Sequence, residues 1–261
     1  MLRLALLAAC TIAGSTVFAT ALRAPSAYRV PGTSYLKYLP VQGGAAQRPL
    51  LDQTDFSTPA SSAVNWGQPL PEAVVWENYD VLLERFKKVR NLRWMKTVDQ
   101  PDFARRISWL YPDDGCYARA GLVVFNLAQW LVKLPNKAFA FGNLTVKTPN
   151  ALNGEVSWWY HVVPVVQIDK QKYVLDPTID PLQPMKLEDW VGAMSPDPSS
   201  VQVAICGSGS YSPDDLCNKE SDGAEAMAMN DQNSFLYSEW SRLLELKRVP
   251  EAELGDNPPW N

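Results

Sequence analysis

Histidine is nearly missing from this chain: His161 is the one histidine among 261 residues, and there are four cysteines. A metal site needs several histidine, cysteine or acidic ligands at close spacing, and one histidine with widely spaced cysteines offers no such cluster. The glycine-rich loops that hold nucleotide phosphates, Gly-x-x-x-x-Gly-Lys-Ser/Thr and Gly-x-Gly-x-x-Gly, are missing as well. We therefore predict that the chain has no metal site and uses no cofactor.

Long runs of one charge are also missing. The 24 basic and 28 acidic residues give a net charge of −4 without a basic stripe, so the charge pattern of a nucleic-acid-binding protein is absent. A mildly acidic chain gains little from anionic membrane surfaces. With 46% hydrophobic and 20% charged residues, the composition is that of a globular protein, and we expect no nucleic-acid partner and no stable membrane insertion.

The first 21 residues have the features of a secretory signal peptide. Arg3 provides the positive start, apolar residues follow up to Phe18, and residues 19–21 (Ala-Thr-Ala) form a small-residue cleavage site. The apolar run is shorter than a transmembrane helix requires. The sequence before Cys10 resembles a lipobox, but nine residues are very few for such a signal, so we favour cleavage after Ala21 over a lipid anchor at Cys10. The protein is therefore expected to be periplasmic or secreted.

Three cysteines remain once Cys10 leaves with the signal peptide. Cys206 and Cys217 flank a loop rich in Gly, Ser, Pro and Asp, and in an oxidising compartment they can close a small disulfide ring. Cys116 is left without a partner. A spare thiol in an exported protein is a liability unless it is buried or used, so Cys116 is the first candidate for chemistry.

The rest of the chain divides into an arm and a folded domain. Residues 22–71 are rich in Pro, Gly, Ala and Ser and are expected to form a loop-rich arm or pro-segment, and residues 72–261 the domain. Periodicity and turn residues predict helices over 76–90, 116–134, 187–194 and 224–248, the last as one helix or a broken pair, and strands over 138–147, 158–168, 173–176 and 201–205. This order indicates an α+β fold with a mostly buried central helix.

Cys116 stands at the predicted start of the central helix. Asp113 and Asp114 can cap free backbone N–H groups there, and Gly115 lets a substrate come close to the backbone. The unpaired N–H groups and the positive end of the helix dipole favour thiolate over thiol and can stabilise an oxyanion. The alternative is a buried structural cysteine.

His161 and Asp176 can complete a catalytic set with Cys116. His161 lies on an otherwise apolar strand, where a polar ring needs a partner. Asp176 ends the next predicted strand, and an even number of loop residues would place both side chains on one face. An acid beside the ring holds the useful tautomer. A hydrogen-bonded core histidine and a turn aspartate are the structural alternatives.

Three motifs around these residues resemble those of bacterial protein-glutaminases, also called protein-glutamine deamidases. Residues 114–120 (Asp-Gly-Cys-Tyr-Ala-Arg-Ala) resemble the nucleophile motif, residues 159–165 (Trp-Tyr-His-Val-Val-Pro-Val) the histidine strand, and residues 173–177 (Tyr-Val-Leu-Asp-Pro) the aspartate strand. The resemblance implies that the central helix carries the nucleophile and packs on an antiparallel sheet, as in the transglutaminase and papain-like core. One position departs from the family pattern, which continues with a histidine where this chain has Gly121.

The resemblance also implies a reaction. Cys116 is expected to be the nucleophile, His161 the base and Asp176 the residue that orients it. Residues 72–261 would then be a catalytic domain that converts accessible glutamine side chains of a protein or peptide to glutamate through a thioester, with release of ammonia. The residues expected to line the cleft are Tyr117, Trp159 and Tyr160.

Two other readings of the sequence stay open at this point. A transglutaminase or a papain-like peptidase would use the same three residues, and only the products separate them: crosslinks, peptide fragments or free ammonia. A non-catalytic secreted binding module would keep the fold with an inert thiol, and it predicts that Cys116 reacts with iodoacetamide no faster than an ordinary thiol.

Overall fold

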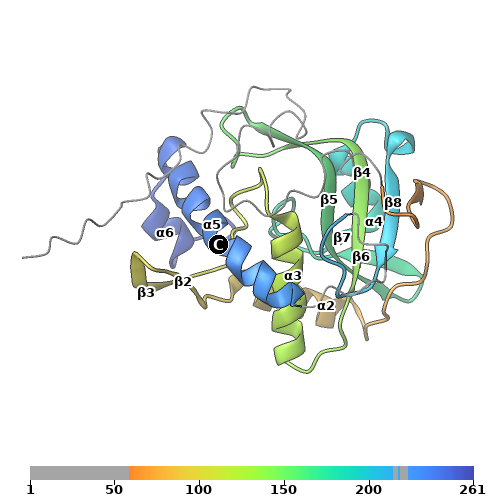
Figure 1. The fold of residues 1–261 in the computed structure, drawn as a ribbon, viewed down its shortest axis with the longest axis horizontal. Helices are drawn as coiled ribbons and strands as arrows, with labels where there is room; N and C mark the ends of the chain where they lie inside the picture. Colours follow the sequence, from red (N-terminus) through yellow and green to blue (C-terminus); the bar gives the residue numbers. More distant parts are fainter. Residues whose placement is uncertain (1–58, 214–216, 218–222) are drawn as a thin grey trace, which may run out of the picture.

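A computed structural model describes residues 59–213, 217 and 223–261 of the chain (Figure 1). The predicted signal peptide, residues 1–21 with Cys10, lies outside the described residues, as does most of the predicted arm. The described part is a mixed α/β structure built on a six-stranded sheet and a separate two-stranded sheet. The α+β class predicted from the sequence is confirmed.

The large sheet is antiparallel throughout and has the strand order β1-β8-β4-β5-β6-β7. Its strands are β1 (Val64–Asn65), β4 (Asn136–Lys147), β5 (Glu155–Ile168), β6 (Gln171–Val174), β7 (Met185–Lys186) and β8 (Gln202–Cys206). A hairpin of β2 (Met95–Thr97) and β3 (Gln100–Arg105) forms the small sheet. The aromatic and β-branched residues that favour strands are concentrated in β5, which lies in the middle of the large sheet.

The helices begin and end for local reasons. They are α2 (Tyr79–Asn91), α3 (Cys116–Gln129), α4 (Leu187–Met194), α5 (Ala224–Glu245) and α6 (Pro250–Leu254). The helix predicted over 116–134 ends at Gln129, before Pro135, because Leu131 takes a φ of 55° and the N–H of Val132 bonds to the carbonyl of Leu127. This is a left-handed helix end of the Schellman type.

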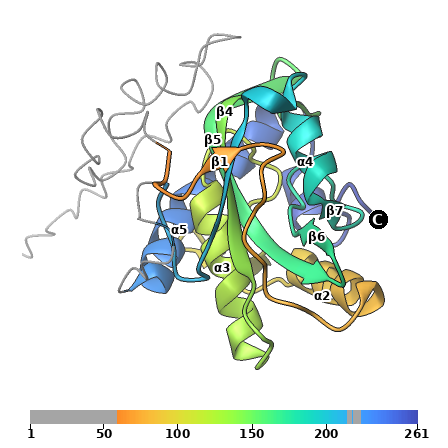
Figure 2. The ribbon, with the colours of Figure 1, turned by 90° about the vertical axis from the view of Figure 1, so that its right-hand side faces the viewer.

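Two of the helices pack on opposite faces of the large sheet. Figure 2 shows α3 and α4 on either side of β4 and β5. On the α4 side, Trp190 packs with Val165 and other strand residues. On the α3 side, Leu122 packs with Val166 of β5 and with Leu236 of α5. The central helix is therefore enclosed between the sheet and α5, which explains why it is apolar around most of its circumference.

A bulge interrupts the pairing of β4 with β5. Phe141 pairs with Tyr160 and Leu144 pairs with Trp158, so three steps along β4 match two steps along β5. Gly142 takes up the extra residue at a φ of 151°, a conformation that favours glycine. Across from it on β5, Trp158 packs in the cluster under α4, whereas Trp159 and Tyr160 both pack in the cluster of Cys116, so the alternation between the two faces is broken at these residues.

The described end of the predicted arm, residues 59–71, adds to the domain. Val64 and Asn65 pair with β8 and form the edge strand of the large sheet. Trp66 and Leu70 pack against the apolar cluster under α4. The last residues before position 72 therefore contribute both backbone pairing and apolar packing, while the role of the arm as a whole stays a prediction.

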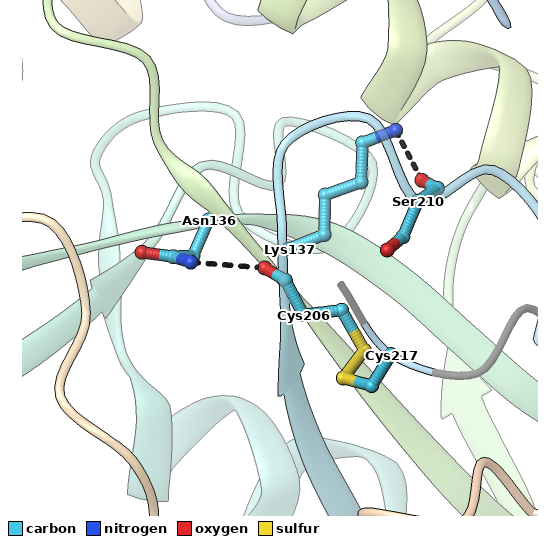
Figure 3. Close-up of a disulfide and its surroundings, with 5 residues drawn as sticks. All are labelled: Asn136, Lys137, Cys206, Ser210 and Cys217. Carbon is cyan, nitrogen blue, oxygen red and sulfur yellow. Dashed lines mark hydrogen bonds between the residues drawn. A yellow bond between two sulfur atoms is a disulfide. The ribbon is translucent and has the colours of Figure 1, made fainter. Parts of the chain in front are cut away.

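A disulfide joins Cys206, at the end of β8, to Cys217 in the loop before α5 (Figure 3). This is the pairing that the sequence predicted. Nδ2 of Asn136 donates to the carbonyl of Cys206 (3.0 Å), and the buried Lys137 ammonium donates to the carbonyl of Ser210 (2.6 Å). The loop closed by the disulfide is thereby also fastened to the start of β4.

Candidate active site

Cys116 is the first residue of α3. Gly115 before it has a φ of 84°, in the left-handed region that favours glycine, and no described side chain caps the helix there. The Cys116 side chain is buried, and it is the one cysteine outside the disulfide among the residues that the structure describes. Cys116 therefore stands in the first turn of the helix, at the position that the sequence predicted.

The acidic residues before Cys116 do not cap α3, contrary to the prediction. Asp113 is buried and pairs with Arg242 of α5 (Oδ2 to Nη1, 2.6 Å). Oδ1 of Asp114 accepts the N–H of Gly115 (2.6 Å), which precedes the first turn. The prediction failed because it weighed only local partners, whereas the partner of Asp113 lies 129 residues away.

Arg119 fastens the loop before the helix from inside α3. Its Nη1 donates to the carbonyls of Tyr111 and Asp114, at 3.0 and 2.7 Å. The side chain is buried, so these charge-assisted bonds are shielded from water. The loop that delivers Cys116 is therefore held at two points from the helix that the cysteine begins.

The hairpin of β5 and β6 brings the predicted histidine and aspartate together. Its loop has two residues, so the even-number condition for placing both side chains on one face is met. Val165 pairs with Val174, and two further steps along each strand reach positions 163 and 176. Asp176 lies just past the end of β6, not within it as predicted, and its Oδ2 lies 2.8 Å from Nε2 of His161.

Each member of this pair keeps its charge in spite of burial. Burial lowers the pKa of His161, but the charge and hydrogen bond of Asp176, together with those of Cys116, raise it to about 9. Burial likewise raises the pKa of Asp176, but His161, the Trp190 N–H and the charge of Arg119 outweigh it and lower the pKa. The ring is therefore positively charged near neutral pH and the carboxylate is ionised.

A second group that acts on the imidazole is the side chain of Cys116. Asp176 occupies Nε2, so Nδ1 is the ring nitrogen left for the sulfur. Nδ1 makes no hydrogen bond of ordinary geometry with a described group, whereas Cys116 contributes both a hydrogen bond and a charge to the His161 pKa. We infer from these two observations that the thiol lies on the Nδ1 side of the ring.

Two tryptophans that the sequence did not single out for this role enclose the His161 ring. Trp158 stacks on it, with ring centroids 4.6 Å apart and an angle of 9°, and Trp190 of α4 is tilted against it at 5.6 Å. Residues three apart in a regular strand face opposite sides, so the stacking of Trp158 depends on the bulge. Nε1 of Trp158 also donates to the carbonyl of Pro112 (2.9 Å), in the loop leading to Cys116.

The residues predicted to line the cleft are unequally exposed. Trp159 and Tyr160 are 9% and 7% exposed and belong to an aromatic cluster that also contains Cys116. Tyr117 is only partly buried and lies edge-on to Tyr211 and Phe235. All three therefore belong to or pack against the cluster that contains Cys116, and Tyr117 is the most open to solvent.

Helix α5 covers the start of α3 closely. A Cβ added to Gly121 would lie 3.0 Å from the Cβ of Ala228 in α5, so the helices meet where a larger side chain would separate them. This is the position where the family pattern has a histidine. The departure at Gly121 is therefore explained by the packing of α5, which the local motif could not reveal.

No group of three or more His, Cys, Asp or Glu side chains suited to a metal ion occurs within residues 59–213, 217 and 223–261. In the same part of the chain, no helix is long and apolar enough to cross a membrane.

A thiol at a helix start and a buried imidazole bonded to a carboxylate are the groups that cysteine hydrolases use. The model of the glutaminase family matches residues 82–194, a segment that contains all three residues. The resemblance predicted from the three motifs is thereby confirmed: this segment is glutaminase-like. Comparison with curated proteins found no match.

Solved structures of protein-glutaminases are similar to this chain. A crystal structure of protein-glutaminase is 21% identical, with 60% of this chain and 88% of that chain covered and a TM-score of 0.46. A crystal structure of pro-protein-glutaminase is 22% identical, with coverage of 69% and 66% and a TM-score of 0.48. The NMR structure of protein-glutaminase from Chryseobacterium proteolyticum is 23% identical, with coverage of 59% and 85% and a TM-score of 0.47.

Proposed function

We propose that this protein is a cysteine hydrolase that deamidates glutamine side chains in proteins or peptides. The observation that carries the proposal is the coincidence of two findings. The glutaminase family model matches residues 82–194, and within that segment His161 is bonded to Asp176 and acted on by Cys116. The same site on a transglutaminase-like core would be the expected setting for acyl transfer from a carboxamide.

The reaction begins with attack of the Cys116 thiolate on the γ-carboxamide carbon of glutamine. A C–S bond forms, and the oxyanion is stabilised by backbone N–H groups near the start of α3. His161 gives a proton to the departing nitrogen, the C–N bond breaks, and ammonia leaves. Water, deprotonated by His161, then attacks the thioester. The C–S bond breaks, and the products are a glutamate side chain and the free thiol.

The protonation states at the site suit the first step. A ring whose pKa is raised to about 9 is an imidazolium at neutral pH and has a proton to give to the leaving ammonia. The ionised Asp176 stabilises that charge and keeps Nε2 as the donor to its carboxylate. The proton passed to substrate therefore comes from Nδ1, on the side that faces Cys116.

We also propose that the protein works outside the cytoplasm. The disulfide between Cys206 and Cys217 supports this because such bonds persist in oxidising compartments, and the predicted signal peptide over residues 1–21 supports it independently. The predicted arm would then cover the cleft before activation. Ala60, at its described end, is buried in the same cluster as Cys116, Trp159 and Tyr160, and this packing supports the idea.

Ammonia release from a glutamine-rich denatured protein tests the proposed reaction. Wild type, Cys116→Ala and His161→Gln are compared, and intact mass spectrometry of the substrate runs alongside. The proposal expects ammonia from wild type alone, with a mass gain of about 1 Da per modified glutamine and no fragments or crosslinks. Fragments would instead establish a peptidase, and crosslinks a transglutaminase.

Alkylation of Cys116 completes the test. The Cys206–Cys217 disulfide leaves Cys116 as the free thiol of the described chain, so iodoacetamide reports on this site. No ammonia, with a thiol that reacts at an ordinary rate, would establish the non-catalytic binding module and overturn the proposal.

A further inference from the structure

The carboxylate of Asp176 accepts hydrogen bonds at both oxygens. Oδ2 accepts from Nε1 of Trp190 (3.0 Å) and lies 2.8 Å from Nε2 of His161. Oδ1 accepts the backbone N–H of Thr178 (3.1 Å). An indole nitrogen and a backbone N–H can only donate. Together with His161, the Trp190 N–H lowers the pKa of Asp176 in spite of its burial, and an ionised carboxylate can only accept hydrogen bonds.

This restriction fixes where the imidazole carries its hydrogen. If Oδ2 is an acceptor, Nε2 of His161 must be the donor in the bond between them. When the ring loses one proton, it then loses the proton on Nδ1, because Nε2–H is held by Asp176. The neutral ring presents a bare Nδ1 to Cys116, which is the form needed to take a proton from the thiol or from water.

Trp190 is placed so that its N–H has one possible direction. The side chain is fully buried on α4, within the apolar cluster that joins α4 to β4, β5 and β8. Its ring also lies against the His161 ring at 5.6 Å. Packing therefore fixes both the indole and the imidazole relative to the carboxylate, so that rotation of the carboxylate away from His161 would leave the Trp190 N–H buried without a partner.

We propose that Trp190 is a positioning residue, which fixes the tautomer of His161 by holding Asp176 as an acceptor. The proposal rests on the proposed function in taking His161 as the group that transfers protons. Trp190 donates its one hydrogen bond to Asp176 and acts on His161 through that carboxylate. The shift of the Asp176 pKa below its ordinary value, to which the Trp190 N–H contributes, supports the assignment.

The charged groups around the ring are few among the described residues. Cys116 faces it from α3 and Asp176 from the end of β6, while Arg119 of α3 acts on Asp176. From α4, the side chain that faces the ring is Trp190, which has no titratable group. A change in the titration of His161 after substitution of Trp190 therefore reports a change in Asp176 or in the ring itself, because no charge has been added or removed.

The test replaces Trp190 by phenylalanine, which keeps an aromatic ring and removes the N–H. Trp76→Phe is the matched control, because Trp76 is also buried and its Nε1 donates to the carbonyl of Lys133 (2.8 Å). We expect Trp190→Phe to lower kcat about 10- to 100-fold, the range typical of partners that orient a functional histidine. KM should change little, since the substrate is not touched, and the control should keep wild-type kcat.

Nitrogen NMR of the His161 ring separates a positioning role of Trp190 from a purely structural one, because a purely structural role would leave the tautomer of His161 unchanged. His161 is the one histidine of the chain, so its ring signals need no assignment. Above the pH at which the ring titrates, wild type and Trp76→Phe should show the Nε2–H tautomer. Trp190→Phe should show a mixture of tautomers and should titrate at lower pH. The full-length protein after signal removal is used for every variant.

A folded Trp190→Phe protein with the wild-type tautomer, titration and kcat would overturn the proposal. If the phenylalanine variant does not fold, position 190 is filled with β-(benzothiophen-3-yl)alanine, which matches the indole in shape but lacks the N–H. The same three measurements on that variant then test the proposal. Because the NMR measurement needs no substrate, it separates the two proposals. If the wild-type protein releases no ammonia, the proposed deamidase reaction is wrong, whereas the NMR result on the His161 tautomer still holds.

Discussion

The phenyl ring of Phe235 lies where the side chain of residue 115 would be: a Cβ added to Gly115 would stand 2.6 Å from Cδ2 of Phe235. Phe235 belongs to α5, outside the segment that matches the glutaminase family. The residue before the candidate nucleophile is therefore a glycine for two separate reasons, the left-handed backbone and the contact with α5.

Substitution Gly115→Ala is expected to destabilise the protein by about 2 kcal/mol or more, since left-handed strain and overpacking each cost on the order of 1–3 kcal/mol. Gly154→Ala is the control, because Gly154 also has a positive φ (74°) but open space around it. Urea denaturation measures both. Equal losses in the two variants would mean that the contact with Phe235 contributes nothing.

Gly121→His, which restores the family residue, is expected to destabilise by about 1–3 kcal/mol, because α3 and α5 must separate to make room. Gly192→Ala is the matched helical control. Gly192 has nothing within 4 Å of an added Cβ, so alanine there should stabilise by up to about 1 kcal/mol. Thermal denaturation of both variants checks the prediction, and a neutral Gly121→His would contradict the packing explanation.

Breaking the buried ion pair between Asp113 and Arg242 should cost about 3–5 kcal/mol, because the remaining charge stays buried without its partner. Arg242→Met is the variant to measure in urea. Asp256→Asn removes the charge of the exposed partner of Arg93 and should have little effect. Similar losses from the two substitutions would show that burial of the first pair is irrelevant.

The His161–Asp176 pair predicts a pH dependence of stability. The pKa of His161 is raised in the folded protein to about 9 from an ordinary value of 6.5, so its contribution is complete below 6.5 and is lost as pH rises to about 9. Comparing thermal denaturation of wild type and His161→Gln between pH 6 and 10 isolates it from other groups. The advantage of wild type should shrink across this range, and a constant difference would be inconsistent with the raised pKa.

Two truncated chains separate inhibition by the arm from its part in the fold. A chain beginning at residue 59 keeps β1 and Trp66, and it should be as stable as the longer protein and more active if the arm covers the cleft. A chain beginning at residue 72 loses the edge strand and the packing of Trp66, and it should be less stable by about 2 kcal/mol or more. Unchanged activity at the first boundary would reject a covering role for the residues before 59.

The elements that could be predicted were those whose sequence pattern is local. The helix over residues 187–194 has the predicted bounds, and the strand around His161 was placed within a few residues. The hairpin of β2 and β3 was missed, because its strands are short, irregular in register and interrupted by Pro101. Periodicity cannot detect strands of this length.

The residues of the candidate site also fall into those that the sequence could predict and those that it could not. Cys116, His161 and Asp176 could be named from their motifs, and the two-residue hairpin loop brings the last two together as expected. The partners that hold them could not be named. Trp158 reaches the ring because of a bulge, and Asp113 finds Arg242 across the length of the chain. Such contacts depend on tertiary packing, which one sequence does not encode at any fixed spacing.

The position of α5 has a consequence for the timing of folding. Phe235 against Gly115, Ala228 against Gly121 and Arg242 against Asp113 all come from a helix that is synthesised more than 100 residues after Cys116. The packing around the start of α3 is thus incomplete until the last part of the chain has been synthesised. A nascent or C-terminally shortened chain would therefore carry Cys116 at a helix start that lacks the packing and the ion pair that α5 supplies.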